Sequence, residues 1–318
     1  MNRLTLAVLV LALLHSTAAA AETFVLISDI NGRYGSTSYH TRVQSAVDLI
    51  TEIQPNAVLS TGDLVAGQKQ PKLDRDWLDR MWQVFDETVA RPLEQAGIAL
   101  LPTPGNHDGS AFPGFALERE QFQAYWSERD GSVEILPGSE WPRRYAAQLG
   151  DVLLVAFDGT MPGSLAREEH VLVKRMLRAS GPEAGWTLVL GHLPLWPLAR
   201  GREREIINDA GLLATLQKQG VDAYLSGHHH VYYPGVDDAG MLHLAVGALG
   251  GNARSFSGES GKQPHSFARL ECAEGRISVA SLSAPDFSAS IAPAGLPASV
   301  PGPLGVLHRL EGDLPLRP

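Results

Sequence analysis

The feature that most constrains the fold of this chain is a unit that occurs five times, a short apolar run that stops abruptly at polar side chains. Short apolar runs bounded by glycine and proline are typical of buried strands. The runs and their following residues are FVLIS before Asp29, AVLST before Gly62 and Asp63, IALLPTP before Gly105, Asn106 and His107, TLVL before Gly191 and His192, and AYLS before Gly227, His228, His229 and His230. We therefore expect buried strands with polar groups just beyond their ends.

Segments with helical spacing lie between these runs. One apolar stripe contains Val43, Ala46, Val47 and Ile50, and a second, in a longer helix interrupted near Pro92, contains Leu73, Trp77, Met81, Phe85 and Val89. A further strand is expected over residues 151–160, before a basic helical segment at 168–178. Strands that alternate with helices favour an α/β fold in which helices cover a sheet.

Six potential metal ligands share one kind of position, the loop after a predicted strand. They are Asp29, Asp63, Asn106, His192, His228 and His230. Each alone has an ordinary interpretation as a turn residue, a helix cap or a hydrogen-bonded histidine. Functional residues of α/β sheets gather beyond the carboxyl ends of the strands, however, and six such groups exceed what turns require. His229 points away from its neighbours if the loop is extended.

The order of the polar blocks is Asp-x-Asn, Gly-Asp, Gly-Asn-His-Asp, Gly-His-x-Pro and Gly-His-His-His. Over roughly residues 24–232 the chain resembles the calcineurin-like metallophosphoesterases, whose signature has Asp-x-His as its first block and then the same blocks in the same order. The purple acid phosphatases, a neighbouring branch, fit less well. Their second block carries a metal-binding tyrosine, and here residues 62–68 read GDLVAGQ.

This resemblance implies a four-layered α/β/β/α sandwich with a dinuclear metal site at the carboxyl ends of the strands. Asp29 and His230 would hold the first metal, Asp63 would bridge both, and Asn106, His192 and His228 would hold the second. A carboxylate bridges two ions about 3.5 to 4 Å apart, which an imidazole ordinarily does not do. The mixed ligands suit divalent or trivalent Fe, Mn, Zn or Ni and do not choose among them.

The resemblance also implies hydrolysis of phosphate monoesters or diesters by a metal-bridging hydroxide. Metal ions lower the pKa of a bound water toward neutrality. We expect His107 to be the general acid or a transition-state hydrogen-bond donor, with Asp108 orienting its ring. The alternative is that this pair only stabilises its loop. Arg33 and Arg254 are candidates for substrate binding, and the alternative for both is an ordinary surface arginine.

The first block departs from the family pattern, because Asn31 stands where the usual residue is histidine. A neutral amide is a poorer ligand than imidazole for a transition metal. We therefore expect a first metal site that is weaker or richer in oxygen than usual, or an Asn31 that contacts substrate or water.

Residues 1–21 have a basic start at Arg3, an apolar run from Leu4 to Leu14 and a small-residue end, which indicates a secretory signal peptide. The run is too short and wrongly flanked for a stable membrane anchor. Cys272 is the only cysteine, so neither an internal disulfide nor a lipid-modified amino-terminal cysteine is expected. These features predict a periplasmic or secreted protein.

The charge balance limits the partners. Loss of Arg3 with the signal peptide leaves 25 basic against 35 acidic residues, a net charge of about −10 with neutral histidines. Nucleic acid and anionic membrane need lysine and arginine to meet their phosphates, so neither is expected. The expected partner is a small phosphorylated substrate, and the sequence indicates no oligomeric state.

The chain is predicted to contain one catalytic domain over residues 22–283. Residues 241–256 read as a strand that leads into a glycine-rich loop ending near Arg254. Residues 284–318 are rich in proline and lack a sustained period, so we expect an irregular or mobile tail, with the alternative that LGVLHRL, residues 304–310, packs back on the domain.

Three functions remain open from the sequence. The favoured one is an exported, metal-dependent phosphoesterase. The second is a catalytically weak protein that uses metal to bind a phosphorylated ligand, and the third is a purely structural metal protein. The third ranks last because a closed structural site does not need an Asn, a bridging Asp and an additional His at the same edge.

Overall fold

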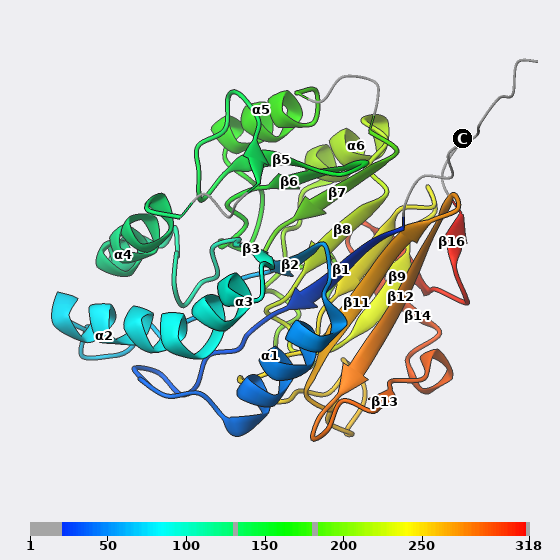
Figure 1. Ribbon diagram of the computed structural model, residues 1–318. Helices are drawn as coiled ribbons and strands as arrows, with labels where there is room; N and C mark the ends of the chain where they lie inside the picture. Colours follow the sequence, from blue (N-terminus) through cyan, green and yellow to red (C-terminus); the bar gives the residue numbers. More distant parts are fainter. Residues whose placement is uncertain (1–20, 130–132, 180–183, 316–318) are drawn as a thin grey trace, which may run out of the picture.

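The computed structural model describes residues 21–129, 133–179 and 184–315 (Figure 1). The predicted signal peptide therefore lies outside the described residues, apart from its last position. Among the described helices, none has the length and apolar character needed to cross a membrane.

The first sheet has the strand order β13-β12-β11-β1-β2-β3, with β16 paired to β12. Its strands are β1 Glu22–Ile27, β2 Ala57–Ser60, β3 Ala99–Leu101, β11 Ser266–Ala273, β12 Arg276–Ser283, β13 Ala289–Ser290 and β16 Leu314–Pro315. Strands β1, β2 and β3 are parallel, and the antiparallel pair β11 and β12 extends the sheet beyond β1. The carboxyl ends of β1, β2 and β3 thus lie at one edge.

The second sheet has the order β14-β15-β9-β10-β8-β7-β6-β5-β4. Its strands are β4 Glu134–Ile135, β5 Tyr145–Leu149, β6 Val152–Ala156, β7 Trp186–Leu190, β8 Ala223–Ser226, β9 Tyr233–Val236, β10 Leu242–Ala245, β14 Ser299–Gly302 and β15 Gly305–Arg309. The central strands β6, β7, β8 and β10 are parallel. Almost every residue in them is buried, as expected for parallel strands covered on both faces.

The helices are α1 Thr41–Ile53, α2 Arg75–Phe85, α3 Arg91–Gln95, α4 Ala116–Ser127, α5 Arg167–Met176 and α6 Ala210–Lys218. A π-helical segment, Asp86–Ala90, joins α2 to α3, and short 3-10 turns occur at Pro113–Phe115 and Pro293–Gly295. Figure 1 shows α1 to α3 beside the first sheet and α5 and α6 beside the second.

The alternation of side chains along β1 explains the layers. Phe24 and Leu26 pack into a core shared with the second sheet, whereas Val25 and Ile27 pack into a separate core with α1 and α2. Because successive strand residues face opposite sides, one apolar strand covers both cores. The two sheets therefore stack face to face between outer helices, which confirms the predicted α/β/β/α class.

The predicted helical stripes are recovered with one difference. The buried face of α1 consists of the four expected residues, but in α2 Trp77 is 41% exposed and the buried face is Leu78, Met81, Trp82 and Phe85. The interruption near Pro92 is the π-helical segment, after which Pro92 occupies the first turn of α3, where its missing N–H is tolerated.

The expectation of an irregular tail is corrected for its described part, residues 284–315. This part forms strands β13 to β16, and β14 and β15 make a hairpin whose second strand pairs with β9 through His308 and Arg309. Val300 and Leu307 are buried in the core of the domain. The prediction was wrong because it took the prolines as a sign of irregular structure, whereas edge strands and turns accommodate proline.

Candidate metal centre

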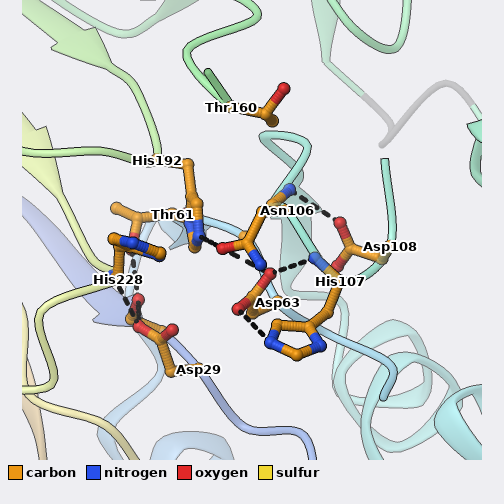
Figure 2. Close-up of polar contacts among 12 residues, drawn as sticks. Asp29, Thr61, Asp63, Asn106, His107, Asp108, Thr160, His192 and His228 are labelled. Atoms are coloured by element: carbon orange, nitrogen blue, oxygen red, sulfur yellow. Dashed lines mark hydrogen bonds and ion pairs between the residues drawn. The ribbon is translucent and has the colours of Figure 1, made fainter. Parts of the chain in front are cut away.

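The predicted ligands lie two to five residues beyond the carboxyl ends of their strands, on loops that converge from both sheets. Asp29 follows β1, Asp63 follows β2, Asn106 follows β3, His192 follows β7, and the loop with His228 and His230 follows β8. Figure 2 shows the side chains of Asp63, Asn106 and His192 turned toward one another. The polar residues that follow these strands in the sequence thus form one cluster in the structure.

Four of these residues adopt left-handed backbone conformations. The φ angles are 49° at Asp29, 57° at Asp63, 61° at His228 and 54° at His230. Such conformations are uncommon outside glycine, although Asn, Asp and His adopt them more readily than other residues, and they concentrate at functional sites. The abrupt turn after each strand is what directs the side chain into the cluster.

Close approach of the loops requires glycine at two neighbouring positions. A Cβ atom on Gly105 would lie 2.1 Å from the backbone nitrogen of Asp63, and one on Gly227 would lie 1.9 Å from Oγ of Ser28. Both distances are far below van der Waals contact. Gly105 therefore lets the loops after β2 and β3 of the first sheet approach each other, and Gly227 lets the loop after β8 of the second sheet meet the end of β1.

Asp29 and His230 form the first ligand pair. His230 Nδ1 lies 2.7 Å from the carbonyl oxygen of Asn252, which places a proton on Nδ1 and leaves the lone pair on Nε2. Nε2 lies 3.0 Å from Oδ1 of Asp29, a buried oxygen that accepts no hydrogen bond from the described residues. These two atoms therefore face each other at hydrogen-bond distance, and either a proton or a cation between them satisfies both.

The charge of Asp29 is also stabilised. Burial alone would raise its pKa, but His230, His192 and the Ser28 hydroxyl hold the pKa of this carboxyl well below its usual range. Its Oδ2 accepts hydrogen bonds from Ser28 Oγ at 2.5 Å and from the backbone N–H of His228 at 2.9 Å. One oxygen is thus held by the protein while the other faces the site.

A second convergence involves Asp63, Asn106 and His192. Nδ1 of His192 lies 2.7 Å from the carbonyl oxygen of Thr61, so its Nε2 carries the lone pair. That Nε2 is 3.0 Å from Oδ1 of Asn106 and 3.5 Å from Oδ1 of Asp63. These three acceptor atoms lie close together, and a combination of imidazole and oxygen ligands matches the donor set of a transition-metal site.

His228 completes this second group. One ligand atom from each of Asp63, His192 and His228 can be chosen so that all three lie within 4.8 Å of one another, and all three residues are buried. Burial lowers the pKa of His228 to about 4, against the opposing effect of Glu205. Its ring is therefore neutral near pH 7, the state in which histidine binds metal.

His107 stands beside this cluster. Its backbone N–H donates to Oδ1 of Asp63 at 2.8 Å, its Nδ1 lies 3.1 Å from the carbonyl oxygen of Gly67, and its Nε2 lies 3.8 Å from Oδ2 of Asp63. With Nδ1 engaged by Gly67, Nε2 is the nitrogen directed toward the ligands, as Figure 2 shows.

The expected role of Asp108 is corrected. Its carboxylate accepts backbone N–H groups from Leu64 at 2.5 Å and Gly105 at 2.6 Å, and among the described residues no hydrogen bond joins it to the His107 ring. The Gly67 carbonyl holds the ring instead. Asp108 therefore ties two ligand-bearing loops together, and its burial, with the nearby Asp63, raises its pKa to about 7.

The remaining candidates differ in their placement. Asn31 is buried, and its backbone N–H donates to the Asp63 carbonyl at 3.2 Å, which puts it beside the cluster; its ligand role stays a prediction. Arg33 is exposed. Arg254 is half-buried, and burial followed by the nearby Arg202 lowers its pKa, while the charges of Asp29 and Glu205 oppose this effect.

Three further residues belong to the surroundings of the site and carry no motif that would reveal them. Gln68 accepts a hydrogen bond from Nδ2 of Asn106 at 3.0 Å, which turns Oδ1 toward His192. Glu205 lies 2.7 Å from Nε2 of His228. Tyr34 packs against His107. Gln68 follows the Gly-Asp block by five residues, and the other two lie in irregular loops.

Comparison with known proteins agrees with this geometry. The family described as calcineurin-like phosphoesterase matches residues 22–232. No curated protein sequence matches the chain.

Two phosphatase structures are similar in fold. A purple acid phosphatase, PPD1, from yellow lupin (Lupinus luteus) seeds has a TM-score of 0.63 at 14% identity, covering 83% of this chain and 52% of the lupin chain. A dimetal phosphatase from Danio rerio has a TM-score of 0.57 at 16% identity, covering 93% of this chain and 99% of its own. This chain thus spans about half the length of the lupin protein.

A third similar structure is GAP50 of Plasmodium, described as the anchor in the inner membrane complex. Its TM-score is 0.54 at 14% identity, with 83% of this chain and 84% of that chain covered. At such identities the likeness establishes the fold alone.

Proposed function

Because the chain belongs to the calcineurin-like phosphoesterase family, we propose that it is an exported hydrolase that cleaves phosphate monoesters or diesters with two bound metal ions. The observation that carries the proposal is the pairing of acceptor atoms at two neighbouring points, Asp29 with His230 and Asn106 with His192. The two atoms of each pair are 3.0 Å apart, and a cation bound between them would satisfy both lone pairs in this buried site.

The residues present fit a dinuclear site. Asp29 and His230 would hold one ion, Asn106, His192 and His228 the other, and the carboxylate of Asp63 would bridge them. Such ions, when bound, supply positive charge to phosphate oxygens and acidify a coordinated water. Metal identity among Fe, Mn, Zn and Ni is left open by this donor set.

The side chain of His107 is the proposed proton donor to the departing alkoxide. Its Nδ1 is held by the Gly67 carbonyl, and its Nε2 lies on the side of Asp63. Because the Gly67 carbonyl accepts the Nδ1 proton, donation from Nε2 requires a ring that carries a proton on both nitrogens. General acid catalysis of this kind contributes about 10² to 10⁴ in rate.

Arg254 is the better placed of the two candidate substrate-binding arginines. Its guanidinium interacts electrostatically with Asp29 and Arg202, and its buried Nε has no hydrogen-bond partner among the described residues. A buried donor on a charged group is costly unless it is paired, and a phosphate oxygen would pair it. We assign Arg254 to the phosphate of the substrate, and the exposed Arg33 to a distal substrate group.

A binding function is the second candidate, and Asn31 favours it. An amide in place of imidazole weakens the first metal site, and a protein with one well-held metal could bind a phosphorylated ligand with little turnover. The fold does not decide, because phosphatases and a protein described as an anchor share it.

The decisive experiment counts metals and measures hydrolysis together. The mature protein should contain two equivalents of metal and hydrolyse p-nitrophenyl phosphate or its bis-ester, and Asp63→Asn should lose both the second equivalent and at least 10³-fold in kcat/KM. Asp238→Asn, which removes an exposed carboxylate, is the matched control and should behave as wild type. One bound metal without turnover of a panel of monoesters, diesters and cyclic nucleotides would support the binding function instead.

Export is tested separately. Expression of the full chain in a bacterium should give a periplasmic protein that lacks residues 1–21 by intact mass. Retention of the full mass in the cytosol would reject this part of the proposal.

A further inference from the structure

The three histidines of the proposed metal site differ in the group that holds one of their ring nitrogens. His192 donates to the Thr61 carbonyl and His230 to the Asn252 carbonyl, each at 2.7 Å. Both of these partners are neutral backbone groups. His228 is different, because its Nε2 lies 2.7 Å from a carboxylate oxygen of Glu205.

We propose that Glu205 is a positioning residue for the second metal, which holds His228 with its proton on Nε2 and presents Nδ1 to the ion. A neutral imidazole has one N–H and one lone pair, so a carboxylate at Nε2 leaves Nδ1 as the ligand atom. A hydrogen-bonded carboxylate also raises the basicity of the ring and so strengthens the ligand. This inference rests on the dinuclear site of the proposed function.

Glu205 is itself fixed from several directions. Arg202 forms an ion pair with its carboxylate, and Nε2 of His229 lies 3.1 Å from its backbone oxygen. Nδ1 of His229 accepts the backbone N–H of Leu198 at 3.2 Å and of Ala199 at 3.3 Å, so the His229 proton is on Nε2 and is donated to Glu205. The middle histidine of the motif therefore clamps the loop that carries Glu205 to the loop that carries the ligands.

The consequence is an asymmetry between the two metal sites. His228 and His230 are two residues apart in one loop, yet they are predicted to bind through different nitrogens, Nδ1 for His228 and Nε2 for His230. The second site gains a partly buried carboxylate in its outer shell, whereas the first site relies on a carbonyl and has Asn31 in place of a histidine. We therefore expect the second site to bind its metal more tightly.

Zinc affinity is the direct test, because it requires no turnover. Metal-free protein is titrated with Zn²⁺ against a competing fluorescent chelator, for wild type, Glu205→Gln, Glu205→Ala and Glu203→Gln. Glu205→Ala should weaken the tighter of the two sites by about 10- to 100-fold, with Glu205→Gln intermediate because it keeps an acceptor oxygen. Glu203→Gln removes the same charge two residues away, where Oε1 accepts from Gly201 and Ser257, and should leave both affinities unchanged.

A spectroscopic readout keeps the inference testable if Glu205→Ala fails to fold. In zinc-loaded wild type labelled with ¹⁵N-histidine, long-range ¹H–¹⁵N spectra should show His228 bound through Nδ1, and His192 and His230 bound through Nε2. In Glu205→Gln the Co²⁺-loaded protein should keep the visible-band intensity of wild type, because the number of ligands is unchanged.

Several results would overturn the inference. They are wild-type zinc affinity in Glu205→Ala, an equal loss in Glu203→Gln, zinc on Nε2 of His228, or a change in Co²⁺ band intensity that makes Glu205 a ligand itself. Failure of the proposed function is distinguishable, since a protein that binds two zinc ions as described and hydrolyses no phosphoester would leave the role of Glu205 intact.

Discussion

The ring of Tyr34 lies against the ring of His107, with centroids 4.9 Å apart and planes inclined by 40°. Tyr34 is 57% exposed, whereas the His107 side chain is only 16% exposed. The tyrosine therefore shields one side of the proposed acid from solvent. Because His107 is the proposed proton donor to the departing oxygen, leaving groups of different basicity test its role.

His107→Ala is expected to slow hydrolysis in proportion to the basicity of the leaving group. An alkyl phosphate, whose alkoxide needs a proton, should lose about 10² to 10⁴ in kcat. p-Nitrophenyl phosphate, whose phenolate departs without one, should lose much less. Steady-state kinetics on the two substrates with metal content verified provides the measurement. Equal losses on both would remove His107 from proton transfer and leave it a positioning role.

Gln68→Leu is expected to weaken the second metal, since the Gln68 side chain accepts from Asn106 Nδ2 and so turns Oδ1 toward His192. Loss of such outer partners typically costs 10- to 100-fold in metal affinity. Gln68→Glu keeps an acceptor at the same place and should retain most of the affinity. Chelator competition with Zn²⁺ distinguishes them, and indistinguishable variants would contradict the orienting role.

Asn31→His is expected to tighten the first metal site and to shift its preference toward softer ions. Imidazole is the better ligand for a transition metal, and Asn31 already lies buried beside Asp63. Zn²⁺ and Mn²⁺ titrations of both proteins measure the change in preference. Unaltered affinities would show that the side chain at this position does not face the metals.

Asp108→Asn is expected to destabilise the fold. The carboxylate accepts the backbone N–H groups of Leu64 and Gly105, and an amide would direct its NH₂ at one of these donors. The loss of a satisfied buried acceptor should lower the free energy of unfolding by about 1 to 3 kcal/mol in urea denaturation. The exposed Asp286→Asn serves as control, with a change within about 0.5 kcal/mol. A comparable loss in both would argue against the loop-tying role.

Cys272 is expected to resist alkylation until the protein unfolds. Burial, with smaller contributions from Asp222 and Glu22, raises the pKa of its thiol to about 12 from an ordinary 9.0. Below pH 9.0 the thiol is protonated in both states. As pH rises from 9.0 toward 12, the unfolded thiol ionises first, so the free energy of unfolding falls relative to its value near neutrality.

Two measurements follow for this thiol. At pH 8, DTNB should label one thiol in urea and almost none in the native protein. Between pH 9 and 11, wild type should lose stability faster than Cys272→Ala, by at most about 1.4 kcal/mol per pH unit. Rapid labelling of the native protein at pH 8 would contradict the protected thiol.

The sequence predicts the strand ends well because a parallel strand that is buried on both faces is an uninterrupted apolar run. The first polar residue after the run then marks the end of the strand. Asp29, Asp63 and His192 were accessible to such reasoning. The structural role of Asp108 was not, because its partners are backbone groups of Leu64 and Gly105 in loops whose approach depends on the whole sheet. Glu205 lies in an aperiodic loop and is placed by His229, a contact that no spacing rule indicates.

The tail illustrates a second limit. Strand β15 pairs with β9, which lies roughly seventy residues earlier in the chain. The composition of β15 alone therefore gives little indication that it forms a strand. Trp77 illustrates a third, since a spacing of four drifts by about 40° per step around a helix with 3.6 residues per turn, so the N-terminal end of the predicted stripe leaves the buried face.

The left-handed turns at Asp29, Asp63, His228 and His230 also limit which amino acids these positions accept. Backbone angles of this kind disfavour β-branched and bulky side chains relative to Gly, Asn, Asp and His. Asn, Asp and His can also bind metal ions, so the backbone conformation and metal coordination favour nearly the same few amino acids at these positions. Anyone who transplants this site to another sheet would therefore need to build the turns first, because a scaffold with ordinary strand ends would point the same ligands elsewhere.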